Sequence, residues 1–432
     1  MTAAALDEFL GVAALAGHEP ARLESGEQVV SYALLPTVED VRRVMSRATA
    51  EQRRLRQETF FHPAIAARRR LGQGMHDRGE AVVFAGGTTE SELDRYGIAR
   101  HMPAHVKAIS VREKSLRPGE VWDVSVRGAI WGIDDLEELY VLVNVGTLRM
   151  APGSSVAVHG NVFSFCCGTL VAEGGEGDEP CTIEVGATPF SVDARSGPLH
   201  GTAGRHGTRG DDGARGIPLV TERTIIGLKL LGELDERAMR GAPGASGTDG
   251  ARGGDGRNGG MAKIAEITLR RLHGRLTVVA RGGSGGNGGR GGDGGDGGSG
   301  GDGAPGAKLI RGDIAPGRGG DGGRGGDGGR GGDAGHGGVS SSVYVVAPPE
   351  DASRITCIAH RADGGRPGTG GAAGRGGAAG APGGTAGESG RAGRSGRPGR
   401  TRPGPVIFLN ELPATPFVTS APSSNSDRKA TS

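Results

Sequence analysis

The sequence predicts a mainly β protein with a bundle of polyglycine-II helices, made of a small α-containing N-terminal domain, a β head and six antiparallel glycine-triplet helices. Three observations predict it: helical apolar spacing before residue 117, a period of two between residues 118 and 196, and glycine at every third position in six later tracts. With 87 glycines in 432 residues and only 3% aromatic residues, one apolar core cannot organise the whole chain.

Residues 1–117 have nearly ordinary composition and carry one clear helix signal. Thr37 followed by Asp40 is typical of a helix N-terminus, and apolar residues then recur at helical spacing from Val38 to Ala48. We interpret the arginines at 53–56 and 68–70 as solvated faces, because the net charge of +2 argues against a strongly basic nucleic-acid binder.

Residues 118–196 alternate between apolar and polar side chains. Trp122, Val124 and Val126 begin the pattern, and turn signals such as Pro152-Gly153 and Gly160-Asn161 divide it into short strands. This pattern indicates an all-β segment and leaves a sandwich and a β-helix equally open.

Residues 197–405 contain the triplets. The six tracts run over 201–216, 241–259, 282–306, 319–338, 365–383 and 384–399. Strand-like segments at 261–281 and 339–363 interrupt them and look like copies of one unit, and a closing strand follows at 406–413. We therefore expect three antiparallel glycine hairpins to project from the β head, and residues 414–432 to form a disordered tail.

An isolated glycine triplet tract has no reason to fold, since glycine loses more backbone entropy on ordering than any other residue. A bundle of three-residue helices supplies partners for the outward N–H and C=O groups, and glycine permits the close approach. The third positions then line one face. In tract four this predicts a ladder of alternating charge, formed by Arg318, Asp321, Arg324, Asp327, Arg330 and Asp333. A collagen-like homotrimer is the alternative use of the same period.

Runs such as GGNGGRGGDGGDGGSGGDG at 285–303 resemble the polyglycine-II sandwich of phage tail-fibre tip adhesins, and also bacterial collagen-like and glycine-rich surface proteins. The resemblance covers about half of the chain. It implies that loops joining the glycine helices at their distal end contact a receptor, which here would be 217–240, 307–318 and 383–385. The binding residues it implies are Leu309, Ile310, Arg311, Gly312 and Asp313.

Other chemistry has weak support. The tripeptide RGD occurs at 209–211 and 311–313, and only the second copy falls in a predicted turn. RGG triplets suggest RNA binding, but aspartates neutralise them and aromatic residues are absent. Gly-Asp repeats lack the nine-residue period of calcium-binding rolls. A β-helix enzyme acting on carbohydrate would use acids such as Asp123, Glu137 and Glu138. We expect the four cysteines to be small core residues, and we expect no metal and no cofactor.

These observations predict a non-enzymatic structural or adhesive protein that presents distal loops for surface attachment or assembly. The expected partners are a cell-surface receptor, a glycan or further copies of the chain, with no nucleic acid and no membrane span. The compartment is open, with an extracellular surface or a virion favoured although the N-terminus does not look like a secretory signal. The alternatives are the carbohydrate-active β-helix enzyme and the homotrimeric fibre protein.

Overall fold

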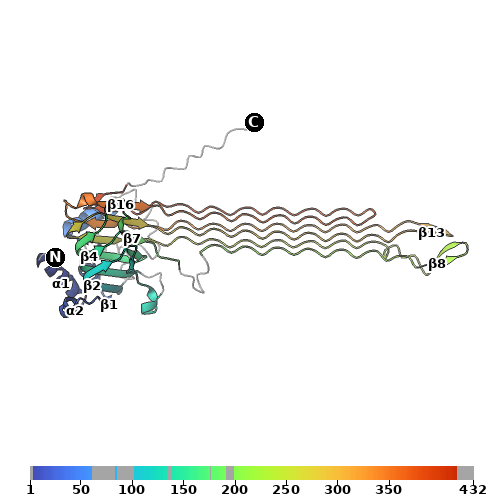
Figure 1. Ribbon diagram of the computed structural model, residues 1–432. Helices are drawn as coiled ribbons and strands as arrows, with labels where there is room; N and C mark the ends of the chain where they lie inside the picture. The colour runs from blue at the N-terminus through green and yellow to red at the C-terminus, as the bar shows by residue number, and fades with distance from the viewer. Residues whose placement is uncertain are drawn as a thin grey trace, which may run out of the picture.

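The structure is a computed structural model that describes residues 3–60, 83–84, 102–133, 138–175, 177–190 and 199–415. The arginines at 68–70, Glu137 and the predicted tail from 416 onward lie outside the described residues. Figure 1 shows a head, which contains both chain segments labelled α1 and β16, and a long set of extended segments that leaves it.

The helices are α1 (Ala3–Leu15), α2 (Pro20–Glu24), α3 (Val38–Met45) and α4 (Ala50–Phe60). The strands of the head are β1 (Val29–Leu35), β2 (Ala104–Leu116), β3 (Val121–Asp123), β4 (Leu139–Met150), β5 (Ser155–His159), β6 (Val162–Ala172), β7 (Cys181–Gly186), β10 (Ala265–Leu269), β11 (Leu272–His273), β12 (Leu276–Arg281), β15 (Val343–Val346), β16 (Ile355–His360), β17 (Ile407–Leu409) and β18 (Leu412–Pro413). Distal strands are β8 (Thr221–Thr224), β9 (Gly227–Leu230), β13 (Ala307–Leu309) and β14 (Gly312–Ile314).

The helix predicted after Thr37 is confirmed as α3. The Thr37 side chain accepts a hydrogen bond from the Asp40 amide at 3.1 Å, which satisfies one of the free N–H groups at the helix start. Val41 and Met45 are buried with no exposed surface, so the apolar stripe of the helix faces the sheet below it.

The head is a coil of mostly parallel strands in two sheets. Sheet A has the order β1-β2-β4-β6-β10-β15-β17-β18, with β11 beside β6, and sheet B has the order β16-β12-β7-β5-β3. The chain alternates between the sheets, so that each turn of the coil adds one strand to sheet A and one to sheet B. This topology decides between the two arrangements that the strand pattern left open, in favour of the β-helix.

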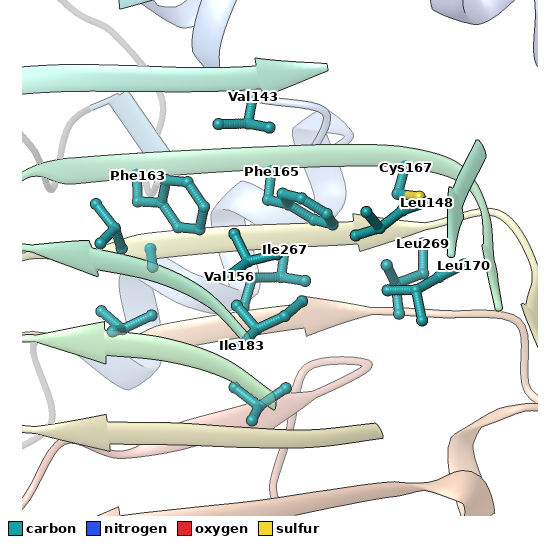
Figure 2. Packing of buried hydrophobic residues seen from close by; sticks show 14 of the residues in the cluster. Val143, Leu148, Val156, Phe163, Phe165, Cys167, Leu170, Ile183, Ile267 and Leu269 are labelled. Atoms are coloured by element: carbon teal, nitrogen blue, oxygen red, sulfur yellow. The ribbon is translucent and has the colours of Figure 1, made fainter. Parts of the chain in front are cut away.

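Side chains stack in register along the coil because successive turns pair in parallel. On sheet A, Val143 pairs with Phe165, Phe165 with Ile267, and Ile267 with Val345. Figure 2 shows Phe165 and Ile267 beside Val156 and Ile183 from sheet B in the interior, and all of these residues belong to one buried cluster. The opposite face of sheet A, which includes Tyr140 and Leu142, packs against the helices.

The predicted fold class is therefore wrong. The chain is mixed α/β: its described residues form three sheets, in which eleven of the fifteen strand pairings are parallel. It is not a mainly β protein built around a bundle of polyglycine-II helices. The physical reason is that the apolar cores lie in the coil and between sheet A and its helices, and the helices do not form a domain of their own.

Buried ion pairs join α4 to the last turns of the coil. The Arg56 guanidinium, which has no exposed side-chain surface, pairs with Glu266 of β10 and with Glu411 at 2.8 Å. It also lies 4.3 Å from the ring centre of Tyr344, which stacks on Phe408. Since a buried charge is costly unless it is paired, this cluster ties together segments that are 210 and 355 residues apart.

The cysteines support the expectation that they are core residues. Cys166, Cys167 and Cys181 are buried and Cys357 is partly buried, and all four are free thiols. Burial raises the pKa of the Cys167 thiol to about 12, so this group stays protonated and unreactive at neutral pH.

Candidate functional site

The six glycine tracts lie side by side and form what we call the glycine-triplet array: tract 1 (201–216), tract 2 (241–259), tract 3 (282–306), tract 4 (319–338), tract 5 (365–383) and tract 6 (384–400). They are inserted in pairs into the coil, after β7, after β12 and after β16. None of them is a helix or a β-strand, and Figure 1 shows them as long parallel traces that leave the head together.

Backbone hydrogen bonds between tracts hold the array in two layers. Tracts 1, 3 and 5 run in one direction, as in the bond from the Gly207 amide to the Asp293 carbonyl at 2.7 Å. Tracts 2, 4 and 6 run the other way, and bonds such as Gly292 N to Ala251 O at 2.9 Å join the two layers. All these bonds form within one chain and between antiparallel as well as parallel tracts. The collagen-like description, which needs three parallel chains, is therefore wrong.

The tracts with the most neighbours have two glycines per triplet, and the tracts with the fewest have one. Tracts 3 and 4 each bond to four tracts, and both of their glycine positions are closely covered. A Cβ at Gly291 would lie 2.0 Å from the Gly329 oxygen, and one at Gly292 would lie 1.9 Å from the Arg205 oxygen. Tracts 1 and 6 have two neighbours and keep one glycine per triplet, such as Gly207.

The predicted charge ladder of tract 4 is exposed and pairs along its own tract. The three ion pairs are Arg318–Asp321 at 3.2 Å, Arg324–Asp327 at 3.1 Å and Arg330–Asp333 at 2.8 Å. Exposed pairs of this kind contribute little to stability.

The aspartates have a second contact that the sequence analysis missed. At several third positions of the triplets, which are the positions not filled by the closely covered glycines, a side chain of the adjacent tract accepts the hydrogen bond of the backbone amide. Examples are Ala372 N to Asp293 Oδ1 at 2.7 Å, Thr385 N to Asp321 Oδ1 at 2.9 Å, and Asn287 N to the ring nitrogen of His200 at 3.0 Å. The signal in the sequence is the recurrence of Asp, Asn or His at the third positions of the triplets.

The far end of the array carries a separate four-stranded sheet, the tip sheet, with the order β14-β13-β9-β8. One hairpin joins tracts 1 and 2 and the other joins tracts 3 and 4, and they meet where Leu228 pairs with Leu309. The Ile310 amide strengthens this junction by donating to the Leu228 carbonyl at 3.1 Å.

The connections at the far end of the array, 217–240 and 307–318, collect exposed apolar side chains. Of the sixteen large hydrophobic residues that are exposed in the described part of the chain, seven lie here: Ile225, Ile226 and Ile310 in the turns of the tip sheet, and Ile217, Val220, Leu231 and Leu234 beside it in the chain. Ile225 and Ile226 form the turn between β8 and β9 and are 106% and 80% exposed. An apolar turn that is exposed to this extent would gain free energy if another surface covered it.

The residues predicted for binding are all at this tip. Leu309 ends β13, Ile310 and Arg311 form the β13–β14 turn, and Gly312 and Asp313 begin β14. All except Leu309 are exposed, and Gly312 takes a positive φ of 132°, which suits glycine. The other RGD copy lies inside tract 1, where Arg209 pairs with Asp212 at 2.6 Å.

The third predicted distal loop lies away from the tip sheet. The turn at 381–383 is beside the start of tract 4, where the Gly319 amide donates to the Pro382 carbonyl at 2.7 Å. The acids proposed for an enzyme have local partners: Asp123 accepts from the Ser125 amide at 2.9 Å and Glu138 from the Tyr140 hydroxyl at 3.1 Å. Among the described residues, no helix is long and apolar enough to cross a membrane.

No family model and no curated protein matches this chain. Among solved structures, it is similar to a nine polyproline type II helical bundle springtail antifreeze protein from Granisotoma rainieri, with 23% identity, covering 48% of this chain and 97% of that one. The TM-score is 0.09, so this likeness carries no argument about fold or site. The resemblance to phage tail-fibre adhesins and to bacterial collagen-like surface proteins is therefore wrong: no such family matches, and the fold is mixed α/β with mostly parallel sheets.

Proposed function

We propose that the protein is a non-enzymatic structural protein that assembles with further copies of itself through the tip sheet. The observation that carries the proposal is the concentration of exposed apolar side chains at the tip, with Ile225 and Ile226 at its turn. Burial of one such side chain is worth about 1.5–3 kcal/mol, which is a strong drive for association when several are covered together.

The glycine-triplet array supports the proposal as a stiff spacer. Each triplet is bonded to its neighbours, and the longest tract has 25 residues. At ~3.1 Å per residue for an extended three-residue repeat, it spans roughly 75 Å. The tip sheet is thereby carried far from the head, where two molecules can meet without their heads touching.

A second copy is the partner favoured by charge. The connection 217–240 contains six of the seven exposed apolar side chains, and its charges balance: four residues are acidic and four are basic (Glu222, Glu233, Asp235, Glu236, Arg223, Lys229, Arg237 and Arg240). A contact between identical surfaces brings equal net charges together, and a near-neutral apolar surface avoids that repulsion.

Sedimentation velocity over a range of protein concentrations tests the proposal. The wild-type chain should form dimers or larger species, and Ile225→Ser/Ile226→Ser should weaken association by at least about tenfold. Val121→Ser/Leu412→Ser is the matched control, because it removes two apolar side chains that are 60% and 72% exposed in the head. A wild-type chain that stays monomeric, or a tip variant that associates like the wild type, overturns the proposal.

A further inference from the structure

A row of four arginines runs along tract 6. Arg391, Arg394, Arg397 and Arg400 are three residues apart and all exposed. Since the array repeats every three residues, the four side chains leave the tract from equivalent positions, at intervals of about 9 Å.

Six arginines elsewhere in the array pair with an aspartate three residues further on, whereas Arg205, Arg257, Arg366 and Arg375 stand singly and have no aspartate at that position. The pairs are Arg209–Asp212, Arg252–Asp255, Arg290–Asp293, Arg318–Asp321, Arg324–Asp327 and Arg330–Asp333. In tract 6 the residue three further on is another arginine at three of the four positions. None of the four guanidinium groups forms an ion pair with another residue of the described ranges.

The acids of the adjacent tract 4 are already engaged, and tract 6 itself holds one acid, Glu388, three residues before Arg391. Asp327 and Asp333 of tract 4 pair with Arg324 and Arg330 and accept the backbone amides of Arg391 and Arg397 at 2.9 and 2.8 Å. The pKa of the Asp333 carboxyl is lowered first by that backbone bond, and the charges of Arg330 and Arg397 lower it further. Because tract 4 is neutral along its own ladder, tract 6 keeps a surplus of positive charge.

The backbone of the row is fixed by tract 4. The carbonyls of Arg391, Arg394, Arg397 and Arg400 accept amides of tract 4 at 2.8, 2.9, 2.9 and 2.9 Å. Because this backbone is already ordered, binding of a polyanion along the row costs little backbone conformational entropy, which favours affinity.

We propose that this row binds a linear acidic polysaccharide laid along tract 6. A straight, evenly spaced line of cations is complementary to an extended chain that carries a sulfate or carboxylate at regular intervals. A single-stranded nucleic acid is a poorer fit, since the six tracts contain no Phe, Tyr or Trp on which bases stack. The site is independent of the tip sheet, because it lies on the part of tract 6 that leads back into the head.

The experiment measures binding of the full-length chain to heparin and to polygalacturonate, which separate sulfate from carboxylate recognition, by titration calorimetry at low salt. Arg391→Gln/Arg394→Gln/Arg397→Gln/Arg400→Gln should weaken binding of the preferred polysaccharide at least about tenfold. The matched control Arg209→Gln/Arg252→Gln/Arg318→Gln/Arg324→Gln removes the same charge from paired arginines and should change it less than about twofold. Ile225→Ser/Ile226→Ser should bind like the wild type, which keeps this result separate from the assembly test.

Three outcomes overturn the inference: no binding to either polysaccharide, equal losses in the two quadruple variants, or tighter binding of a thirty-residue oligothymidylate than of both polysaccharides. Amide hydrogen exchange of each variant verifies that the array is intact. The substitutions keep the backbone amides and carbonyls that hold tract 6.

Discussion

A single alanine in the centre of the array should separate its tracts. In Gly292→Ala, the new Cβ would lie 1.9 Å from the Arg205 oxygen and 2.5 Å from its carbonyl carbon. Both atoms belong to backbone that is bonded on its other side, so no flexible side chain can move away. Tracts 1 and 3 must move apart locally by more than an ångström.

The cost follows from the bonds that meet at this point. They are Gly204 N to Arg290 O, Gly207 N to Asp293 O, Ala251 N to Arg205 O and Gly292 N to Ala251 O, with lengths of 2.8, 2.7, 2.8 and 2.9 Å. At about 1 kcal/mol net for each, their loss costs about 4 kcal/mol. Alanine recovers up to about 1 kcal/mol by restricting the unfolded chain, which leaves a loss of about 3 kcal/mol.

Amide hydrogen exchange measures this loss as a free energy of local opening. Exchange around residues 204–207, 251 and 292 should accelerate roughly a hundredfold, since each 1.4 kcal/mol is a factor of ten. Ser284→Ala, at an exposed third position of the same tract, should leave exchange unchanged. If Gly292→Ala exchanges within a few-fold of the wild type, close packing does not explain the second glycine of the triplet.

Two further predictions concern charge. Arg56→Ala should destabilise the head by about 3–5 kcal/mol in denaturant unfolding, because it leaves the buried Glu266 carboxylate without its ion pair. Glu411→Gln should cost less, since the side chain of Glu411 is 13% exposed. Equal costs of the two substitutions would contradict this account. The Thr385 amide, followed by the Thr385 hydroxyl, lowers the pKa of the Asp321 carboxyl from its ordinary 3.8. The ionised carboxylate therefore contributes to the stability of the array in full above pH 3.8, and this contribution is lost as the pH falls through the lower pKa of the folded state. Thermal unfolding followed by circular dichroism should therefore show a less stable array at pH 2.5 than at pH 5. Asp321→Asn should reduce that difference, and an identical pH dependence in the variant would refute the assignment.

Local patterns in the sequence gave correct local structure. The capping signal at Thr37 and the stripe from Val38 produce α3, and alternation around Val143 and Phe165 produces β4 and β6. These features depend on residues within a few positions of one another, which is why periodicity finds them. The same reasoning placed a turn within 307–318, and the β13–β14 turn at Ile310 and Arg311 lies there.

The direction of strand pairing could not be predicted in this way. Val143 pairs with Phe165 across one turn of the coil, but the partner of Phe165 on the next turn is Ile267, with tracts 1 and 2 between them. Nothing near either residue distinguishes a parallel partner from an antiparallel one. The helices were likewise assigned to a separate domain, because only the fold reveals that Tyr140 and Leu142 present a second apolar face to them.

By itself, the sequence determined the positions of the glycines, the period of three and the alternating charges of tract 4. The tertiary structure decided which tracts are neighbours, and therefore why tract 3 needs two glycines per triplet where tract 1 needs one. It also decided that Asp293 accepts the amide of Ala372 and that Glu266 meets Arg56. The physical reason is that a period depends only on residues close together in the chain. The hydrogen-bond partners of an extended tract lie up to 87 residues away, and they depend on which backbones approach one another in the folded protein.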